Sequence, residues 1–466
     1  MSAVLGANDD IRVAVIGFRG QGSGHIRRLR TIPGVRLVAL CDVDPAVLAA
    51  KAEELSRENV VVETYTDVRK LLESPEIDAI TTATPNHWHA LIGIWACQAG
   101  KDAYIEKPIS HNVWEGRRLV EAARKYDRLV QGGTQSRSNT RIQQAVEWVR
   151  AGSLGEIRAI YGLCYKPRLS IGKAGAGEIP DGLDYDLWCG PAPVKPPTRQ
   201  RFHYDWHWFH DTGNGDMGNQ GIHQMDIARW FLGADALSRG VMSVGGRLGY
   251  DDDGETPNTQ IIVHDYDKVP LFFETRGLPR GSAFHDPALW KTNMDSPDWF
   301  PGGKGVAVVV ECDGGRVYCE RGDVAAYDRD GAKIRDFEAG DDEQGHIENF
   351  IAAVRAGKRE MLHAECRETH LSSALCHTGM ISHRLGHNAR PEEIREQVQS
   401  HPRAAERLAS LEEHLARNGV DLSRTPLTLG PWLSFDPEAE RFVDNAEADA
   451  LLTRRYREPF VVPEVV

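Results

Sequence analysis

Residues 11–131 alternate short apolar runs with amphipathic segments. The apolar runs predict strands at 11–16, 35–41, 60–63, 79–83, 103–105 and 129–131. Segments with helical spacing predict helices at 22–31, 46–57, 67–73, 87–99 and 110–126, the last capped by Ser110. Strands separated by helices of this length pair in parallel through crossover connections. We therefore expect a doubly wound parallel α/β sheet in residues 1–136.

The pattern changes after residue 136. A helix is predicted at 139–151, a strand at 156–165 and a helix at 218–232. Consecutive strand signals with turns then follow around 240–248, 259–276 and 306–329. Runs of strands without intervening helices predict a large open, mostly antiparallel sheet in an α+β domain over 137–390. Helices are predicted at 344–357 and 365–386, and a polar, aromatic insertion spans 166–216. Residues 391–466 are predicted to form a charged helical and then extended, proline-rich arm.

Composition narrows the functional classes. The 466 residues carry 55 Lys and Arg against 68 Asp and Glu, a formal charge of −13, and this balance argues against a nucleic-acid binder. Apolar residues make up 41% of the chain, enough for a substantial core. No apolar run approaches the roughly 20 residues of a membrane helix. The eight cysteines show no CxxC pair, so we expect buried free thiols.

The N-terminal stretch MSAVLGANDD has neither a charged n-region nor an apolar h-region. On the chain as given we expect a cytoplasmic protein. A periplasmic location stays open if an export signal preceded this stretch and was removed.

A glycine-rich turn, Gly17-Phe18-Arg19-Gly20-Gln21-Gly22-Ser23-Gly24-His25, follows the first predicted strand. A dinucleotide turn needs glycines for the tight bend, for backbone approach to the pyrophosphate and for packing of helix on strand. Gly17 and Gly22 fit the first and third roles, and Arg19 stands where the second glycine is expected. We expect Gly20 to take over this second role and Arg19 to reach a phosphate.

Asp42 ends the second predicted strand, 20 positions after Gly22. A carboxylate there accepts hydrogen bonds from both ribose hydroxyls and repels a 2′-phosphate. The N terminus of the helix after the turn offers unpaired N–H groups to the pyrophosphate, so an acidic chain can still hold this anion. These features predict a Rossmann domain that binds NAD rather than NADP.

Two further motifs follow the fourth and fifth predicted strands: Thr84-Pro85-Asn86-His87-Trp88-His89 and Glu106-Lys107-Pro108. Ligands of doubly wound sheets bind at the carboxyl ends of the strands, where both motifs lie. A lysine in a partly dry cleft can donate a hydrogen bond to a hydroxyl that is being oxidised and stabilise the developing alkoxide. We therefore predict Lys107 as a catalytic residue.

These two motifs, with the later stretch Gly218-Asn219-Gln220-Gly221-Ile222-His223-Gln224-Met225-Asp226, resemble those of the glucose-fructose oxidoreductase/inositol dehydrogenase (Gfo/Idh/MocA) family. The resemblance covers nearly the whole chain, from Ile11 to about Leu385. It implies a Rossmann domain joined to an open-sheet α/β domain, bound NAD(P), and sugars or cyclitols as substrates. It also implies a homodimer or homotetramer, formed through the open face of the second sheet, with the C-terminal arm reaching a neighbour.

By position, Lys107 matches the family's catalytic lysine and His223 its catalytic histidine. The family commonly has Asp four residues before this histidine, where this chain has Asn219. Because a neutral amide stabilises imidazolium less well than a carboxylate does, Asp226, Asp211 or Asp216 is expected to substitute. The residues expected at the cofactor are Gly17, Arg19, Gly20, Gly22, Asp42, Thr84, Asn86, His89, Glu106, Lys107 and Gln135.

The insertion carries an aromatic stretch, Arg201-Phe202-His203-Tyr204-Asp205-Trp206-His207-Trp208-Phe209-His210-Asp211. Three interpretations are open: a metal site, a packed aromatic plug, or the wall of a carbohydrate pocket. We prefer the pocket wall, where rings stack on a sugar and polar groups bind its hydroxyls, and we assign no metal because the segment has no cysteine and no second ligand cluster. The expected substrate contacts are Tyr165, Lys166, Arg168, His203, Trp206, His207, Trp208, His210 and His223.

Three functions are compatible with these residues. The leading hypothesis is reversible, NAD-linked oxidation of a secondary hydroxyl of a sugar, glycoside or cyclitol, with Lys107 and His223 assisting proton transfer. The second is a redox-neutral glycoside hydrolase, lyase or epimerase that oxidises its substrate transiently with resident NAD. The third is a non-catalytic sugar or dinucleotide sensor, which the presence of both Lys107 and His223 disfavours.

Overall fold

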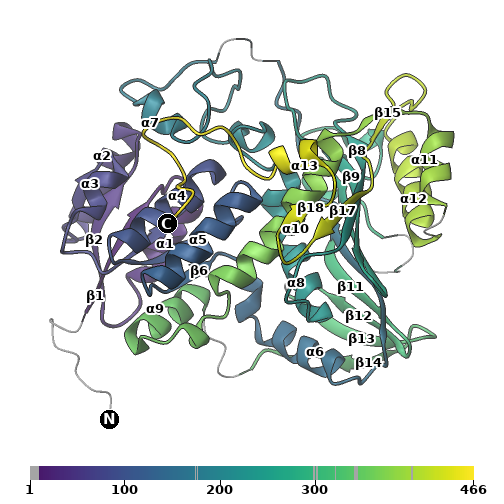
Figure 1. Ribbon diagram of the computed structural model, residues 1–466, viewed down its shortest axis with the longest axis horizontal. Helices are drawn as coiled ribbons and strands as arrows, with labels where there is room; N and C mark the ends of the chain where they lie inside the picture. Colours follow the sequence, from purple (N-terminus) through teal and green to yellow (C-terminus); the bar gives the residue numbers. More distant parts are fainter. Residues whose placement is uncertain are drawn as a thin grey trace.

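The computed structural model describes residues 10–173, 175, 177–297, 300, 303–320, 322–340, 345–399 and 402–466 (Figure 1). Residues 1–9, on which the expectation about an export signal rests, lie outside the described residues. All eight cysteines are buried free thiols, as their scattered spacing predicts. Among the helices that are described, none is long and apolar enough to cross a membrane.

The first sheet has six parallel strands in the order β3-β2-β1-β4-β5-β6. These strands are β1 Ile11–Ile16, β2 Val35–Cys41, β3 Glu63–Tyr65, β4 Ala79–Thr82, β5 Asp102–Ile105 and β6 Val130–Gly132. The connecting helices are α1 Gln21–Leu29, α2 Pro45–Arg57, α3 Val68–Leu72, α4 His89–Gln98 and α5 Val113–Lys125. This strand order is that of the dinucleotide-binding Rossmann fold, and it confirms the predicted doubly wound sheet.

Both faces of this sheet are buried, because alternate residues of each strand enter two different cores. Val13 and Val15 of β1 join the core that α1 covers, while Ala14 and Ile16 join the core under α4 and α5. A helix from late in the chain, α9 (His346–Ala356), completes the first core with Phe350.

The second sheet has twelve strands. Its main path runs β14-β13-β12-β11-β7-β10-β9-β8-β16-β15, and neighbours are antiparallel except β7 and β10. Its bounds are β7 Ile157–Cys164, β8 Gly240–Gly246, β9 Thr259–Tyr266, β10 Val269–Arg276, β11 Val306–Cys312, β12 Gly315–Cys319, β13 Val324–Asp328, β14 Lys333–Asp336, β15 His387–Ala389, β16 Leu427–Leu429, β17 Leu433–Asp436 and β18 Arg441–Phe442. The mostly antiparallel sheet predicted for this half is confirmed.

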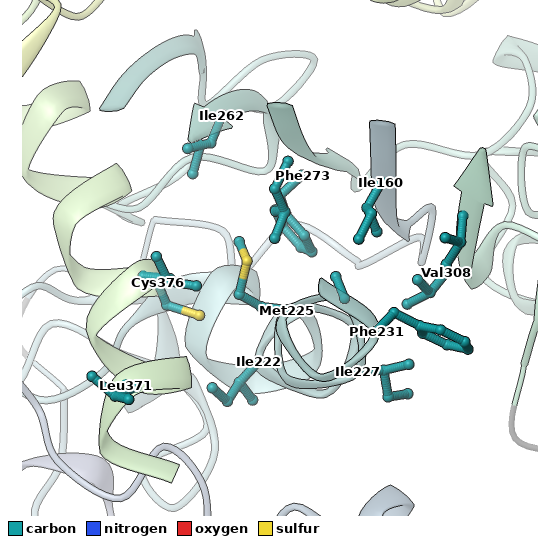
Figure 2. Close-up of a cluster of buried hydrophobic side chains, with 14 of the residues drawn as sticks. Ile160, Ile222, Met225, Ile227, Phe231, Ile262, Phe273, Val308, Leu371 and Cys376 are labelled. Carbon is teal, nitrogen blue, oxygen red and sulfur yellow. The ribbon is translucent and has the colours of Figure 1, made fainter. Parts of the chain in front are cut away.

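Helices α6 (Thr140–Arg150), α8 (Ile222–Leu232) and α10 (Cys366–Arg384) pack on one face of this sheet. Figure 2 shows Ile222 and Met225 of α8 beside Leu371 and Cys376 of α10, with Phe273 and Ile160 of the sheet opposite. Helix α10 also packs against α5 of the first domain. The core therefore fixes the start of α8 relative to the carboxyl ends of the first sheet.

Helices α11 (Pro391–Val398) and α12 (Pro402–Arg417) cover part of the opposite face, which the resemblance left open for a neighbour. Leu408, Leu411 and Leu415 of α12 pack there against side chains of β7, β8 and β9. The boundaries near residues 136 and 390 stay predictions, because α9 and α10 each pack on the first domain.

Two local predictions were wrong. The helix predicted from Ser110 begins at Val113, because the side chain of Asn112 caps it by accepting a hydrogen bond from the N–H of Glu115. The strand predicted at 60–63 lies at Glu63–Tyr65, where the chain pairs with β2. The strand signals predicted around 259–276 form the hairpin of β9 and β10, where Asp267 turns the chain with a φ of 59°.

The predicted extended arm packs along its own chain, and its contact with a neighbour stays a prediction. Residues of β16 and β17 pair with β8, and α13 (Ala446–Ala450) follows. The last residues then cross to the first domain, where Phe460 packs edge-on against Trp88 at 5.4 Å between ring centroids. The Val466 carbonyl accepts a hydrogen bond from Lys125.

Candidate active site

A cavity of about 540 Å³ lies along the carboxyl ends of the first sheet. Its other walls come from the insertion, which includes α7 (Tyr185–Cys189), and from the segment before α8. Residues far apart in sequence therefore meet in one space. The predicted residues that line it are Gly17, Arg19, Gly20, Asp42, Thr84, Asn86, His89, Glu106, Lys107, Gln135, Lys166, Arg168, His203, Trp206, His207, Asn219 and His223.

The glycines of the turn allow backbone segments to approach one another closely. Gly17 has a φ of 72°, in the left-handed region that favours glycine. A Cβ on Gly22 would collide with the carbonyl oxygen of Gly17, so Gly22 lets α1 start directly against the turn. A Cβ on Gly20 would meet no protein atom within 4 Å, and Gly20 borders the cavity. The open space beside Gly20 fits a pyrophosphate placed at the N terminus of α1.

Asp42 lies where β2 ends. Its carboxylate accepts hydrogen bonds from the N–H of Phe18 at 3.4 Å and of Asp44 at 3.1 Å, and it lines the cavity. Burial raises the pKa of Asp42 to about 6, against the opposing effect of these two bonds. The position and the acceptor oxygens of Asp42 fit the ribose hydroxyls of NAD.

Lys107 and Glu106 follow β5. The Lys107 ammonium donates hydrogen bonds to the backbone oxygen of Asn219 at 2.7 Å and to its Oδ1 at 3.3 Å. Burial, with the neighbouring charges of Arg168 and Lys166, lowers the pKa of Lys107, although Glu106 acts in the opposite direction. Lys107 is thus a partly desolvated cation at the cavity wall, as its predicted role requires.

Glu106 is a buried carboxylate with several partners. Its oxygens lie 3.2 Å from Nε2 of His25 and accept a hydrogen bond from Gln135 at 2.9 Å. Burial alone would raise its pKa, but His25, Lys107 and His223 outweigh that effect and lower it to about 2. Glu106 is therefore ionised and acts electrostatically on both predicted catalytic residues.

Asn219 lies in a π-helical turn, Met217–Gly221, that runs directly into α8. Such turns concentrate at functional sites because they redirect one side chain from a regular helix. His223 occupies the first turn of α8 and lines the cavity. The structure therefore gathers Lys107, Asn219 and His223 on one wall.

The predicted substitutes for the missing aspartate lie elsewhere. Asp226 is 1% exposed and forms a bidentate pair with Arg137 at 2.9 Å, and Asp216 pairs with Arg168 at 2.6 Å. Asp211 pairs with Lys195 on the surface of the insertion. None of these three lines the cavity, whereas Glu106 lines it and has a pKa that responds to His223. Which carboxylate supports His223 stays a prediction.

The remaining predicted cofactor contacts hold the loops after β4 and β5 together. The two ring nitrogens of His89 lie 2.6 Å and 2.8 Å from the carbonyl oxygens of Pro108 and Thr84. The Asn86 amide donates a hydrogen bond to Oδ1 of Asn214 at 2.9 Å. His89 thus links the two catalytic loops, and Asn86 links the first of them to the insertion.

The aromatic stretch of the insertion is both a packed cluster and a cavity wall. Trp188, Phe202 and Trp206 share a buried cluster, and Trp206 stacks on the imidazole of His207 at 3.7 Å between ring centroids. Trp206 and His207 also line the cavity. Among the described residues, no three His, Cys, Asp or Glu side chains gather as metal ligands do.

The insertion also closes over the expected adenosine end of the cavity. Nε2 of His203 lies 3.0 Å from the carboxylate of Asp44, the residue that caps α2. The carbonyl oxygen of Trp188 accepts a hydrogen bond from the indole of Trp88 at 3.0 Å. Arg457, from the end of the chain, pairs with Asp186 of α7 at 2.7 Å. Two of these contacts fasten the insertion to the first domain, and the third fastens it to the end of the chain.

Three predicted substrate contacts and one cofactor contact lie outside this cavity. Tyr165 is fully buried on the other side of the second sheet, where its hydroxyl donates a hydrogen bond to Glu274 at 2.7 Å. Gly22 packs beneath the glycine turn, and Trp208 lines a second cavity. His210 is half-buried and lines neither cavity, and burial lowers its pKa to about 4.

Sequence reasoning missed several residues of the site. Gln220 accepts a hydrogen bond from Lys166 at 2.9 Å, and Asn214 connects Asn86 to the backbone of His111. Gln220 stands beside Asn219 in the third motif, so that motif could have indicated it. Trp188 and Asn214 lie in the insertion, which has no helical or strand periodicity from which the direction of their side chains could be predicted.

Two family models match the sequence. One describes an oxidoreductase family with an NAD-binding Rossmann fold and matches residues 11–134. The other describes the C-terminal alpha/beta domain of an oxidoreductase family and matches residues 159–267. Together they cover half of the chain.

Curated relatives match parts of the chain. The sequence is 29% identical over 229 residues to scyllo-inositol 2-dehydrogenase (NAD(+)) of Bacillus subtilis, covering 49% of this chain and 56% of that protein. It is 28% identical over 165 residues to a glycosyl hydrolase family 109 protein of Shewanella pealeana, covering 34% of this chain and 36% of that protein. The match thus spans between about a third and just over half of these relatives.

Solved structures share the fold. An aldose-aldose oxidoreductase from Caulobacter crescentus, complexed with glycerol, has a TM-score of 0.55 at 16% identity and covers 78% of this chain and 94% of that one. The WlbA dehydrogenase from Bordetella pertussis, in complex with NADH and UDP-GlcNAcA, has a TM-score of 0.53 at 18% identity, with the same coverage.

Proposed function

The chain belongs to the Gfo/Idh/MocA family of NAD-binding oxidoreductases, and we propose that it oxidises a secondary hydroxyl of a sugar, glycoside or cyclitol reversibly with NAD. One observation carries the proposal: a single cavity joins the glycine turn and Asp42 to Lys107 and His223. The relative named scyllo-inositol 2-dehydrogenase (NAD(+)) supports the substrate class.

NAD bound in this cavity supplies a nicotinamide ring that accepts hydride from the carbon being oxidised. The Lys107 ammonium donates a hydrogen bond to the substrate oxygen and stabilises negative charge that develops there. His223 takes the hydroxyl proton as the carbonyl forms. Ionised Glu106 stabilises both cations, because it acts on Lys107 and His223 from a buried position where charge is weakly screened.

The second candidate is a redox-neutral reaction. The same residues oxidise a glycoside, the ketone acidifies the neighbouring C–H, and loss of that proton eliminates the aglycone. Water then adds to the unsaturated ketone, and hydride returns from NADH to the carbonyl carbon. The closed insertion favours it, because the His203–Asp44 contact and Trp206 would retain NAD between turnovers. The relative named as a glycosyl hydrolase family 109 protein supports cleavage of a glycosidic bond. The homodimer or homotetramer also stays a proposal, which light scattering on the full chain tests.

Steady-state assays separate the two candidates. The full chain is incubated with NAD and a panel of monosaccharides, cyclitols and glycosides, and both NADH and released aglycone are measured. Net NADH supports the dehydrogenase, whereas bond cleavage without net NADH supports the redox-neutral reaction. Tight sugar binding with neither product contradicts both and identifies a sensor.

A further inference from the structure

A second cavity, also of about 540 Å³, adjoins the first. Lys166, Arg168 and Tyr204 line both, so the two spaces meet at these three side chains. The proposed hydride transfer uses only the first cavity. The residues that complete the second are Pro167, Leu169, Arg201, Trp208, Trp290 and Met294.

Three cationic side chains line the second cavity, and they differ in whether a carboxylate balances their charge. Arg168 is neutralised by its bidentate contact with Asp216 at 2.6 Å and 3.1 Å, and Arg201 lies 2.6 Å from a carboxylate oxygen of Asp205. Lys166 donates instead to the neutral amide of Gln220 at 2.9 Å, and no carboxylate pairs with it among the residues that the structure describes. Of the three cations, Lys166 thus carries the charge that a ligand can balance.

Aromatic rings form the rest of the wall. Tyr204 is 39% exposed, and Trp208 and Trp290 also face the cavity. The guanidinium groups of Arg168 and Arg201 lie 5.5 Å and 4.9 Å from the ring centroids of Trp208 and Tyr204, which holds these rings in place. Flat apolar surfaces beside a few polar groups are typical of sites that stack sugar rings.

We propose that the second cavity binds a second unit of the substrate, a sugar ring that carries a carboxylate, with Lys166 as its partner. This inference rests on the proposed function, since the first unit must lie at Lys107. A nucleoside diphosphate also combines negative charge with a flat ring. One cation without a carboxylate partner matches a single carboxylate better than the two charges of a diphosphate.

Calorimetry on the NAD-loaded full chain tests the proposal. The probes are glucuronosyl, galacturonosyl and mannuronosyl disaccharides, each against the neutral disaccharide with a hydroxymethyl group in place of the carboxylate, and UDP-glucose. We expect the acidic member of at least one pair to bind about tenfold more tightly, the scale of one charge-assisted hydrogen bond. Lys166→Gln should remove this difference, and Tyr204→Leu should weaken both members.

Lys195→Gln is the matched control, because Lys195 lies on the same insertion, outside both cavities, and should leave the preference intact. Equal affinity within every pair, no binding by any disaccharide, a preference that survives Lys166→Gln, or binding of UDP-glucose alone contradicts the proposal. If the wild-type protein binds acidic and neutral disaccharides equally but still forms NADH from neutral sugars, only this inference is contradicted. Acidic preference without hydride transfer contradicts the proposed function only.

Discussion

At the scale of single residues, Lys107 is under opposing influences. Burial and the charges of Arg168 and Lys166 disfavour its ammonium form, while Glu106 favours it. The net effect is a pKa below the ordinary 10.5. A cation of this kind is a stronger hydrogen-bond acid toward a substrate oxygen than a solvated lysine, which is the property that the proposed reaction requires.

Replacing Lys107 with Met should reduce turnover by at least about 100-fold, the usual lower range for loss of an acid–base group. NAD affinity should change little, because the glycine turn and Asp42 are untouched. Turnover and NAD binding are measured on the same preparation, with Lys195→Gln as control. Turnover within about twofold of the wild type would refute the role of Lys107.

The same electrostatics predicts a pH effect. The ammonium form of Lys107 is present below its folded-state pKa, so kcat should fall as pH rises through a value below 10.5. Lys166→Gln removes a charge that lowers this pKa, so the alkaline limb of kcat at saturating substrate should move to higher pH. A limb that stays in place, or moves to lower pH, contradicts the assignment.

At the scale of elements, helix and strand periods predicted most of both sheets, since strands such as β1 and β2 have strong apolar runs. The start of α5 was predicted wrongly because two nearby residues, Ser110 and Asn112, can both cap a helix, and Asn112 does so. Tyr165 was misplaced because side-chain direction alternates along and just beyond β7, so Cys164 faces α8 and Tyr165 the opposite side. The sequence pattern does not state which side holds the ligand.

The π-helical turn before α8 depends on close packing at Gly221. A Cβ there would collide with the ring of Phe273, so Gly221→Ala should push Asn219 and His223 from their positions. We expect a loss of about 1–3 kcal/mol in the free energy of unfolding, with a fall in kcat, measured by urea denaturation and steady-state assay.

Gly24→Ala is the matched control for stability, because its Cβ would lie 3.9 Å from the nearest atom, at the end of Arg27. It should unfold at the same or a slightly higher urea concentration, since alanine favours a helix. Equal stability of the Gly221→Ala protein would show that the turn can shift without cost.

At the scale of the whole molecule, the insertion and the last residues of the chain pack over the first domain and contact each other. The insertion reaches the first domain at Asp44 through His203, and the last residues fasten the insertion through Arg457. Parallel strands place their carboxyl ends at one edge, so the meeting of Asp42, Asn86 and Lys107 was predictable. The path of the insertion and of the C-terminal residues was not, because neither has a periodic pattern.

This closure predicts slow release of the cofactor. Burial lowers the pKa of His203, so near neutral pH its ring meets Asp44 as a neutral hydrogen-bonding group. His203→Ala should speed NAD release about fivefold, the scale of one such bond. Stopped-flow displacement measures it, with Lys195→Gln as control. An unchanged rate would mean that NAD leaves by a route that His203 does not obstruct.

The central claim is that a carbohydrate hydroxyl delivers hydride to NAD beside Lys107. A single-turnover experiment tests it directly: the NAD-loaded full chain is mixed with each sugar, cyclitol or glycoside of the panel, and NADH absorbance is followed. Both redox candidates predict that NADH appears with at least one substrate, lasting or transient, and that Lys107→Met abolishes the signal. Substrate conversion without any NADH signal, or an undiminished signal in Lys107→Met, would contradict the account.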